Sequence, residues 1–156
     1  MEGKAVRLAG SVLDRSRHVC AFFATKEEEY RVLMPFIKEG FDHGDKAFHI
    51  VDSRQRGAHL EKLRSEGIDV DAAQADGRLE VRRWEEAYLR GGRFDQNAML
   101  ELIQEVLASG KQQGFPLTRL VANMEWALED RPGVEDIVEY ETRLNYILPK
   151  YDDAVT

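Results

Sequence analysis

The chain has 156 residues, of which 43% are hydrophobic and 33% charged, and its formal net charge is −7. This length fits one domain with a core of its own, and the single cysteine excludes an internal disulfide. No apolar run approaches the roughly 20 residues that cross a membrane, and the N-terminus lacks a signal-peptide pattern, so we expect a cytoplasmic protein without membrane contact. The acidic balance disfavours direct nucleic-acid binding, which depends on Lys and Arg neutralising phosphates.

The chain divides into a short arm and one larger unit. Residues 1–17 place a few apolar residues among charged ones, and we expect them to form an N-terminal arm. Residues 18–23 (HVCAFF) are short, apolar and partly aromatic, which predicts a buried strand. A single domain is then expected over residues 18–156.

Helix signals follow this run directly. Thr25, with Glu28 three residues later, is a capping box and predicts a helix start. The helix contains Pro35, where a kink or a lost backbone hydrogen bond is expected, and it ends at Gly44. The next apolar run, residues 46–51, predicts a second strand.

The same alternation continues to the end of the chain. A helix is predicted over residues 55–66, a strand over 78–83, a helix capped by Asp95, a strand over 119–124 and a final helix beginning near Pro132. Strands alternating with helices predict an α/β fold with three layers, a mainly parallel sheet flanked by helices on both faces. Residues 152–156 end where another strand is due, and an unfinished sheet edge would invite a partner strand, including one from a homo-oligomer.

The first predicted strand-to-helix turn lacks a phosphate-binding loop. Residues 23–26 contain no glycine, and Glu27, Glu28 and Glu29 follow at the helix start, where a nucleotide phosphate would have to dock. Nucleotide hydrolysis is therefore disfavoured. No GxSxG motif accompanies the serines either, so we expect no catalytic residues and no enzyme activity.

Polar and aromatic side chains follow the predicted strands, at the edge where ligands bind in parallel sheets. Three of the four strand ends supply a carboxylate, and two place an indole beside it, which suits a pocket for a cationic or hydroxylated small molecule. The expected ligand-binding residues are Thr25, Asp52, Trp84, Glu85, Tyr88, Arg93, Glu125 and Trp126. The alternative is that these carboxylates cap helices or pair with nearby arginines.

One further combination could bind a metal. His18 and Cys20 would share a face of the first predicted strand, and His49 lies in the next strand along the chain. A metal or redox site would require the two strands to be neighbours in register. A buried cysteine beside hydrogen-bonded histidines is the commoner arrangement, so no metal and no cofactor are expected.

Several longer stretches resemble one family. These are HVCAFF, EEEYRVLMPFIKEG, AFHIVD, YLRGGRFD and MEWAL, in this order along the chain. Together they resemble the MEDS domain, a sensory domain of methanogen and methylotroph regulators. The resemblance implies a RecA-like fold without working Walker motifs and a role in signal transduction and transcription regulation, with no catalytic residues to carry over.

Two functions remain open at this point. The first is a noncatalytic domain that senses an unidentified small molecule, which would order residues 84–95 and 125–132. The second is a protein-interaction module without a ligand, which would dock a signalling protein through its acidic surface or sheet edge. Any DNA contact would then belong to another chain or domain.

Overall fold

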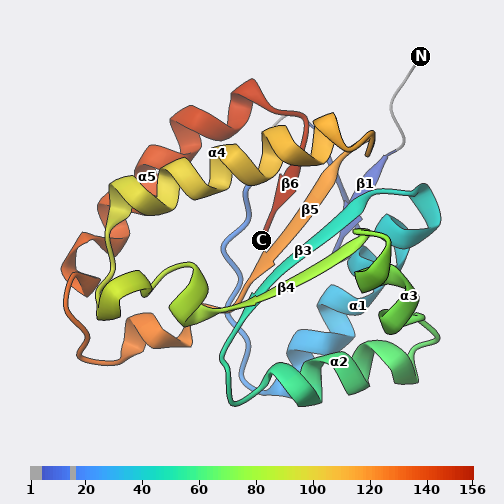
Figure 1. The fold of residues 1–156 in the computed structure, drawn as a ribbon, viewed down its shortest axis with the longest axis horizontal. Helices are drawn as coiled ribbons and strands as arrows, with labels where there is room; N and C mark the ends of the chain where they lie inside the picture. Colours follow the sequence, from blue (N-terminus) through green and yellow to red (C-terminus); the bar gives the residue numbers. More distant parts are fainter. Residues whose placement is uncertain (1–4, 15–16) are drawn as a thin grey trace.

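The computed structural model describes residues 5–14 and 17–156 and shows a parallel sheet covered by helices on both faces (Figure 1). The sheet order is β4-β3-β5-β6, and each neighbouring pair is parallel. Its strands are β3 (Lys46–Val51), β4 (Leu79–Arg83), β5 (Thr118–Ala122) and β6 (Ala154–Val155). The predicted α/β class and the mainly parallel sheet are confirmed, whereas the RecA-like relationship stays a prediction.

The helices form the two outer layers. One face carries α1 (Lys26–His43), α2 (Arg56–Ser65) and α3 (Val70–Ala75), and the other carries α4 (Gln96–Gln112) and α5 (Ile137–Ile147) (Figure 1). Within the described part of the chain, no helix is long and apolar enough to cross a membrane.

Local sequence signals set the bounds of α1. The Thr25 hydroxyl accepts a hydrogen bond from the Glu28 amide at 3.1 Å, and Gly44 ends the helix with a φ of 79°, a conformation that glycine adopts without strain. Pro35 is accommodated inside the helix without ending it. The predicted start and end of this helix are confirmed.

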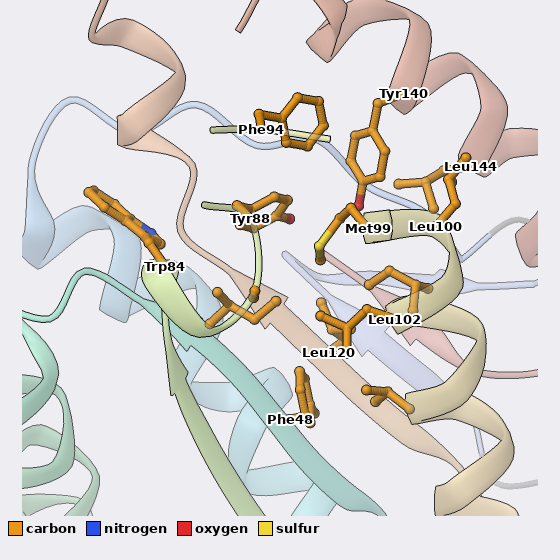
Figure 2. Packing of buried hydrophobic residues seen from close by; sticks show 14 of the residues in the cluster. Phe48, Trp84, Tyr88, Phe94, Met99, Leu100, Leu102, Leu120, Tyr140 and Leu144 are labelled. Carbon is orange, nitrogen blue, oxygen red and sulfur yellow. The ribbon is translucent and has the colours of Figure 1, made fainter. Parts of the chain in front are cut away.

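The central strand β3 is buried along its whole length and supplies two hydrophobic cores. Phe48 and Ile50 point toward α4 and α5, where Figure 2 shows a large aromatic cluster. Ala47 and Val51 belong to the core under α1, α2 and α3. Successive residues of a strand point to opposite faces, so burial on both sides follows from a sheet that carries helices on both.

The predicted strand over residues 18–23 is wrong. This segment is extended but contains only an isolated bridge at His18, and Phe22 is almost fully exposed. The edge of β5 is instead paired with β6, and the backbone amide of Thr156 donates to the Leu120 carbonyl at 2.8 Å. An apolar run forms a strand only where a sheet edge is free to pair, and here the C-terminal residues take that edge.

The N-terminal region forms a hairpin of β1 (Val6–Leu8) and β2 (Ser11–Leu13). Both turn residues, Ala9 and Gly10, have positive φ, as tight hairpin turns require. Val6 is fully buried against α1. The predicted arm over residues 1–17 also includes positions 1–4 and 15–16, which lie outside the described residues, and its separation from the rest stays a prediction.

The last helix begins later than predicted. Pro132 precedes a 3₁₀ turn at Val134–Asp136, and regular α-helix starts at Ile137. Gly133 has a φ of 89°, and a Cβ there would lie 2.1 Å from the Phe94 carbonyl oxygen. This left-handed glycine packs against the chain before α4, so the polypeptide cannot enter the helix at Pro132.

Candidate functional site

The carboxyl ends of β3, β4 and β5 surround a small pocket of about 240 Å³. The chain leaves β3 toward the α2 face and leaves β5 toward the α5 face, so the pocket lies where the sheet connections diverge. This is the position at which ligands bind in open parallel sheets. The pocket is lined by Lys26, Asp52, Arg54, Gln55, Trp84, Asn123, Glu125 and Glu129.

Lys26 is the central cation of the pocket. Its ammonium group donates to Glu29 Oε2 at 2.8 Å and to a carboxylate oxygen of Glu125. The Asn123 side-chain amide donates to the other Glu29 oxygen at 2.6 Å. Partial burial lowers the pKa of Lys26, but hydrogen bonds to Glu125 and Glu29 outweigh it, and the net effect raises the pKa. The first residue of α1 is thus tied to the loop after β5.

A second ion-paired group lies after β3. Arg54 donates to Asp52 Oδ2 at 2.8 Å from Nε and 2.6 Å from a terminal nitrogen, and its Nε is also 3.1 Å from Oδ1. The same guanidinium lies 3.7 Å from Glu129. The hydrogen bonds from Arg54 lower the pKa of Asp52. The pocket is therefore lined by positive and negative side chains, and Lys26 and Arg54 are each ion-paired with a carboxylate that also lines the pocket.

Trp84 forms the apolar wall of the pocket. Its indole is almost fully buried, and Nε1 donates to the Asn123 carbonyl at 2.8 Å. Figure 2 shows Trp84 at the margin of the aromatic cluster, apart from Tyr88, Phe94 and Tyr140. The hydrogen bond fixes the ring across the ends of β4 and β5.

Asp52, Trp84 and Glu125, all expected from the strand ends, come together in this pocket. Thr25 caps α1 and is exposed next to Lys26. Glu85 lies on an exposed 3₁₀ turn, where the Ser53 hydroxyl is 3.5 Å from its carboxylate. The pocket thus gathers only some of the strand-end residues.

Three other expected residues lie away from the pocket. Arg93 is exposed beyond the glycine pair that precedes α4. Tyr88 and Trp126 are buried in the aromatic cluster, with their ring centroids 5.0 Å apart. Trp126 is fully buried, so its indole offers no surface to a ligand in the pocket.

Sequence reasoning left Lys26, Asn123 and Arg54 out of the site. Lys26 reaches the pocket because α1 begins there, although no strand precedes it. Asn123 follows β5 directly. Its backbone N–H donates a hydrogen bond to the Ile50 carbonyl at 2.9 Å and so continues the pairing of β5 with β3. A polar side chain in the first position after a buried strand was the available signal for Asn123.

A chain of buried polar groups lies beside the pocket, under α1. The Tyr30 hydroxyl is hydrogen-bonded to His59 Nδ1 at 2.8 Å, and His59 Nε2 is bonded to His49 Nδ1 at 2.8 Å. Burial lowers the pKa of His59 to about 4 and that of His49 well below its ordinary value. Both imidazoles are therefore neutral at pH 7, so their hydrogen bonds need no counter-ion beside them.

The residues considered for a metal separate into two places. His49 is committed to His59, whereas His18 and Cys20 lie near Glu141 of α5. The expected burial of the cysteine is wrong, because Cys20 is exposed. The hydrogen bond to Glu141 raises the pKa of His18, and partial burial raises the pKa of the Cys20 thiol.

A larger groove of about 970 Å³ runs over the outer surface of α1 and α2. Its lining includes Arg31, Lys38, Asp42 and Glu66, charged side chains that belong to the surface of the two helices. The groove lies away from the strand ends, apart from Lys26, which borders both depressions. We therefore take the smaller pocket as the candidate site.

The chain is an α/β domain with a small polar pocket at the carboxyl ends of its parallel strands. The model of the MEDS family, "MEthanogen/methylotroph, DcmR Sensory domain", matches residues 17–156. The chain belongs to this family.

The curated relative is itself a regulator. The chain is 28% identical over 144 residues to the transcriptional repressor DcmR of Methylorubrum extorquens. The aligned region covers 91% of this chain and 51% of that protein. The chain thus spans about half the length of this relative. No solved structure matches the chain.

Proposed function

We propose that this MEDS domain is a noncatalytic sensor that binds a small polar molecule in the pocket at the ends of β3, β4 and β5 and acts in the regulation of transcription. The observation that carries the proposal is the position of Lys26, which joins α1 to the loop after β5 through Glu125 and also binds Glu29 within α1. The family description and the repressor relative support a regulatory sensory role.

The pocket chemistry restricts the ligand. A volume of about 240 Å³ lies below the roughly 300–1,000 Å³ of pockets for drug-sized molecules, so the ligand is small. Glu125 and Glu129 offer acceptors, Lys26 offers donors and the Trp84 indole offers an apolar wall. A hydroxylated or cationic compound satisfies all three features.

Ligand binding has a direct route to a conformational response. A hydroxyl or ammonium group that binds Glu125 competes with Lys26 for the same carboxylate. Both side chains are near half-exposed, at 42% for Lys26 and 46% for Glu125, so the exchange costs little desolvation. Release of Lys26 removes its link between α1 and the loop after β5, while the Asn123–Glu29 hydrogen bond stays. This difference between two states can be passed to a partner.

The anchoring of the aromatic segment changes the expected mechanism. Residues 84–95 were expected to become ordered on binding, but Trp84, Tyr88 and Phe94 are anchored in the hydrophobic core. We therefore assign the response to the ion pairs of Lys26 and Arg54 rather than to this segment. A cytoplasmic location, DNA contact through another domain and a RecA-like ancestry stay predictions.

The test is a thermal-shift screen of small amines, alcohols and diols. A compound at about 100 times its Kd adds about 2.7 kcal/mol and raises the Tm by roughly 5–10 °C in a domain of this size. The increase should disappear in Glu125→Gln and Lys26→Met. The matched control is Glu101→Gln on the exposed face of α4, which should keep the response.

The alternative is a protein-interaction module without a ligand. It is favoured by the exposed side chains of Phe22, Leu128 and Tyr146, which lie at 76% exposure or more. If no compound shifts the Tm, and a signalling protein binds both wild type and Glu125→Gln with equal affinity, the module replaces the sensor.

A further inference from the structure

Three side chains with metal-binding atoms converge between the segment before α1 and helix α5. His18 Nε2 lies 3.0 Å from Glu141 Oε2, and Cys20 Sγ lies 3.6 Å from the same oxygen. One ligand atom from each residue lies within 4.8 Å of the others. Glu141 lies more than 120 positions from His18 and Cys20 in the chain, so only the fold brings it to them.

These distances suit a tetrahedral metal ion. Zinc bonds of about 2.0–2.1 Å to nitrogen, 2.3 Å to sulfur and 2.0–2.2 Å to oxygen place neighbouring ligand atoms roughly 3.4–3.6 Å apart. The His18–Glu141 and Cys20–Glu141 pairs, at 3.0 and 3.6 Å, differ from this by a few tenths of an ångström at most. The His18 and Cys20 ligand atoms lie within 4.8 Å of each other, so they need to approach by no more than about 1.3 Å. Rotation of exposed or half-buried side chains can supply such a movement.

The orientation of His18 is set by a second contact. Its Nδ1 lies 3.0 Å from Asn145 Oδ1, one turn along α5 from Glu141. Because a carbonyl oxygen only accepts, Nδ1 carries a proton and Nε2 is the atom turned toward Glu141 and Cys20. A metal ion that displaces the Nε2 proton would be bound by the lone pair of this nitrogen. Metal-binding histidines are held in this way, with the second ring nitrogen donating to a neighbouring oxygen.

The accessibility of the cluster leaves room for a fourth ligand. Cys20 is exposed, and the side chains of His18 and Glu141 are 10% and 23% exposed, so the cluster opens to solvent on the cysteine side. Three protein ligands with one open position are the arrangement of reactive zinc sites, whereas structural sites are closed by four. Thiolate and imidazole donors select zinc over magnesium or calcium, which prefer oxygen.

We propose that His18, Cys20 and Glu141 form a zinc site in which the fourth position is open to water or another small donor. The ion links the segment before α1 to α5 and thereby fixes residues 18–20 against the α5 layer. Five residues separate Cys20 from Lys26, so the site also restrains the approach to the pocket. The proposal does not depend on ligand binding in that pocket.

The test is titration of tag-free protein with Co²⁺, which reports thiolate binding through a charge-transfer absorption. We expect one Co²⁺ per chain, a thiolate band, and displacement by Zn²⁺. Cys20→Ser should abolish the band, and Glu141→Gln should weaken binding at least tenfold. Glu139→Gln, an exposed neighbour on α5, is the control and should bind as the wild type does.

A second measurement uses the single cysteine of the chain. Stoichiometric Zn²⁺ should slow alkylation of Cys20 by iodoacetamide at least tenfold in wild type and in Glu139→Gln, but not in Glu141→Gln. Circular dichroism checks that each variant is folded. The proposal is overturned if folded wild type shows no thiolate band, if Zn²⁺ leaves alkylation unchanged, or if Cys20→Ser binds Co²⁺ as tightly as wild type.

Discussion

The two ends of the sheet hold a cation between two carboxylates in opposite ways. At the amino end, Arg119 donates to Asp45 and to Glu39, both at 2.9 Å, and its side chain is only 2% exposed. At the carboxyl end, Lys26 binds Glu29 and Glu125 and is 42% exposed. The same arrangement of charges thus has a buried cation at the amino end of the sheet and a solvent-exposed cation at the carboxyl end.

The surroundings explain the difference. Arg119 also donates to the Phe36 carbonyl at 2.8 Å and lies over the Phe36 ring, so its planar group is satisfied on several sides. Lys26 carries a compact charge on a flexible side chain at the start of a helix, and this side chain is 42% exposed to solvent. A buried, fully paired cation fixes the packing of α1 on the sheet, whereas an exposed pair can be exchanged for a ligand.

The largest expected effect is at the buried end. Arg119→Met leaves Asp45 as a buried, unpaired carboxylate, and we expect the free energy of unfolding to fall by about 3–5 kcal/mol in urea denaturation. Arg78→Met removes an exposed pair with Asp76 and should cost less than about 1 kcal/mol. Equal losses in the two variants would refute the distinction between the ends.

A smaller effect is expected from the neutral histidines between the two ends. The pKa of His59 is about 4 in the folded chain and 6.5 in the unfolded one, so the unfolded state binds more protons between these values. Stability is therefore complete above pH 6.5 and falls as the pH drops toward 4. The difference in proton binding at His59 alone should lower the free energy of unfolding by about 2 kcal/mol between pH 7 and pH 5.

The measurement compares wild type with His59→Gln in denaturant at both pH values. The variant is expected to be less stable at pH 7 but to lose about 2 kcal/mol less than wild type on acidification. Identical pH slopes would show that the imidazole is not held neutral by burial.

The smallest effect is expected at the open end. Lys26→Met should change the free energy of unfolding by no more than about 1 kcal/mol, because the ion pair with Glu125 is exposed and screened by salt. Urea denaturation at low and high NaCl measures it, and the difference from wild type should shrink at high salt. A loss as large as that of Arg119→Met would make Lys26 a structural residue and weaken its role in sensing.

Much of the candidate site follows from strand ends. Asp52 and Glu125 follow buried strands, and parallel strands align their carboxyl ends, so the sequence predicts that both lie at the same edge of the sheet. Trp84 and Trp126 carry the same local signal, yet one borders the pocket and the other is sealed in the aromatic cluster. Both strands lead to the layer of α4 and α5, but Trp84 comes directly after β4, whereas Trp126 is the fourth residue after β5.

Short-range chemistry determined what the sequence could settle alone. The start of α1 at Thr25, its end at Gly44 and the cap of α4 at Asp95 depend on hydrogen bonds within a few residues. The burial of β3 and the parallel sheet follow from apolar runs that alternate with helices. The helix caps require no distant partner, and the strands could be predicted because their apolar runs are themselves local.

Tertiary structure decided the remainder, because competition for a partner cannot be read from local pattern. Residues 18–23 have the composition of a strand, but β6 occupies the available edge, and the segment lies instead with His18 and Cys20 beside Glu141 of α5. The convergence of these side chains, like that of Arg119 with Asp45, joins residues far apart in the chain. Only the packing of the layers brings such groups within bonding distance.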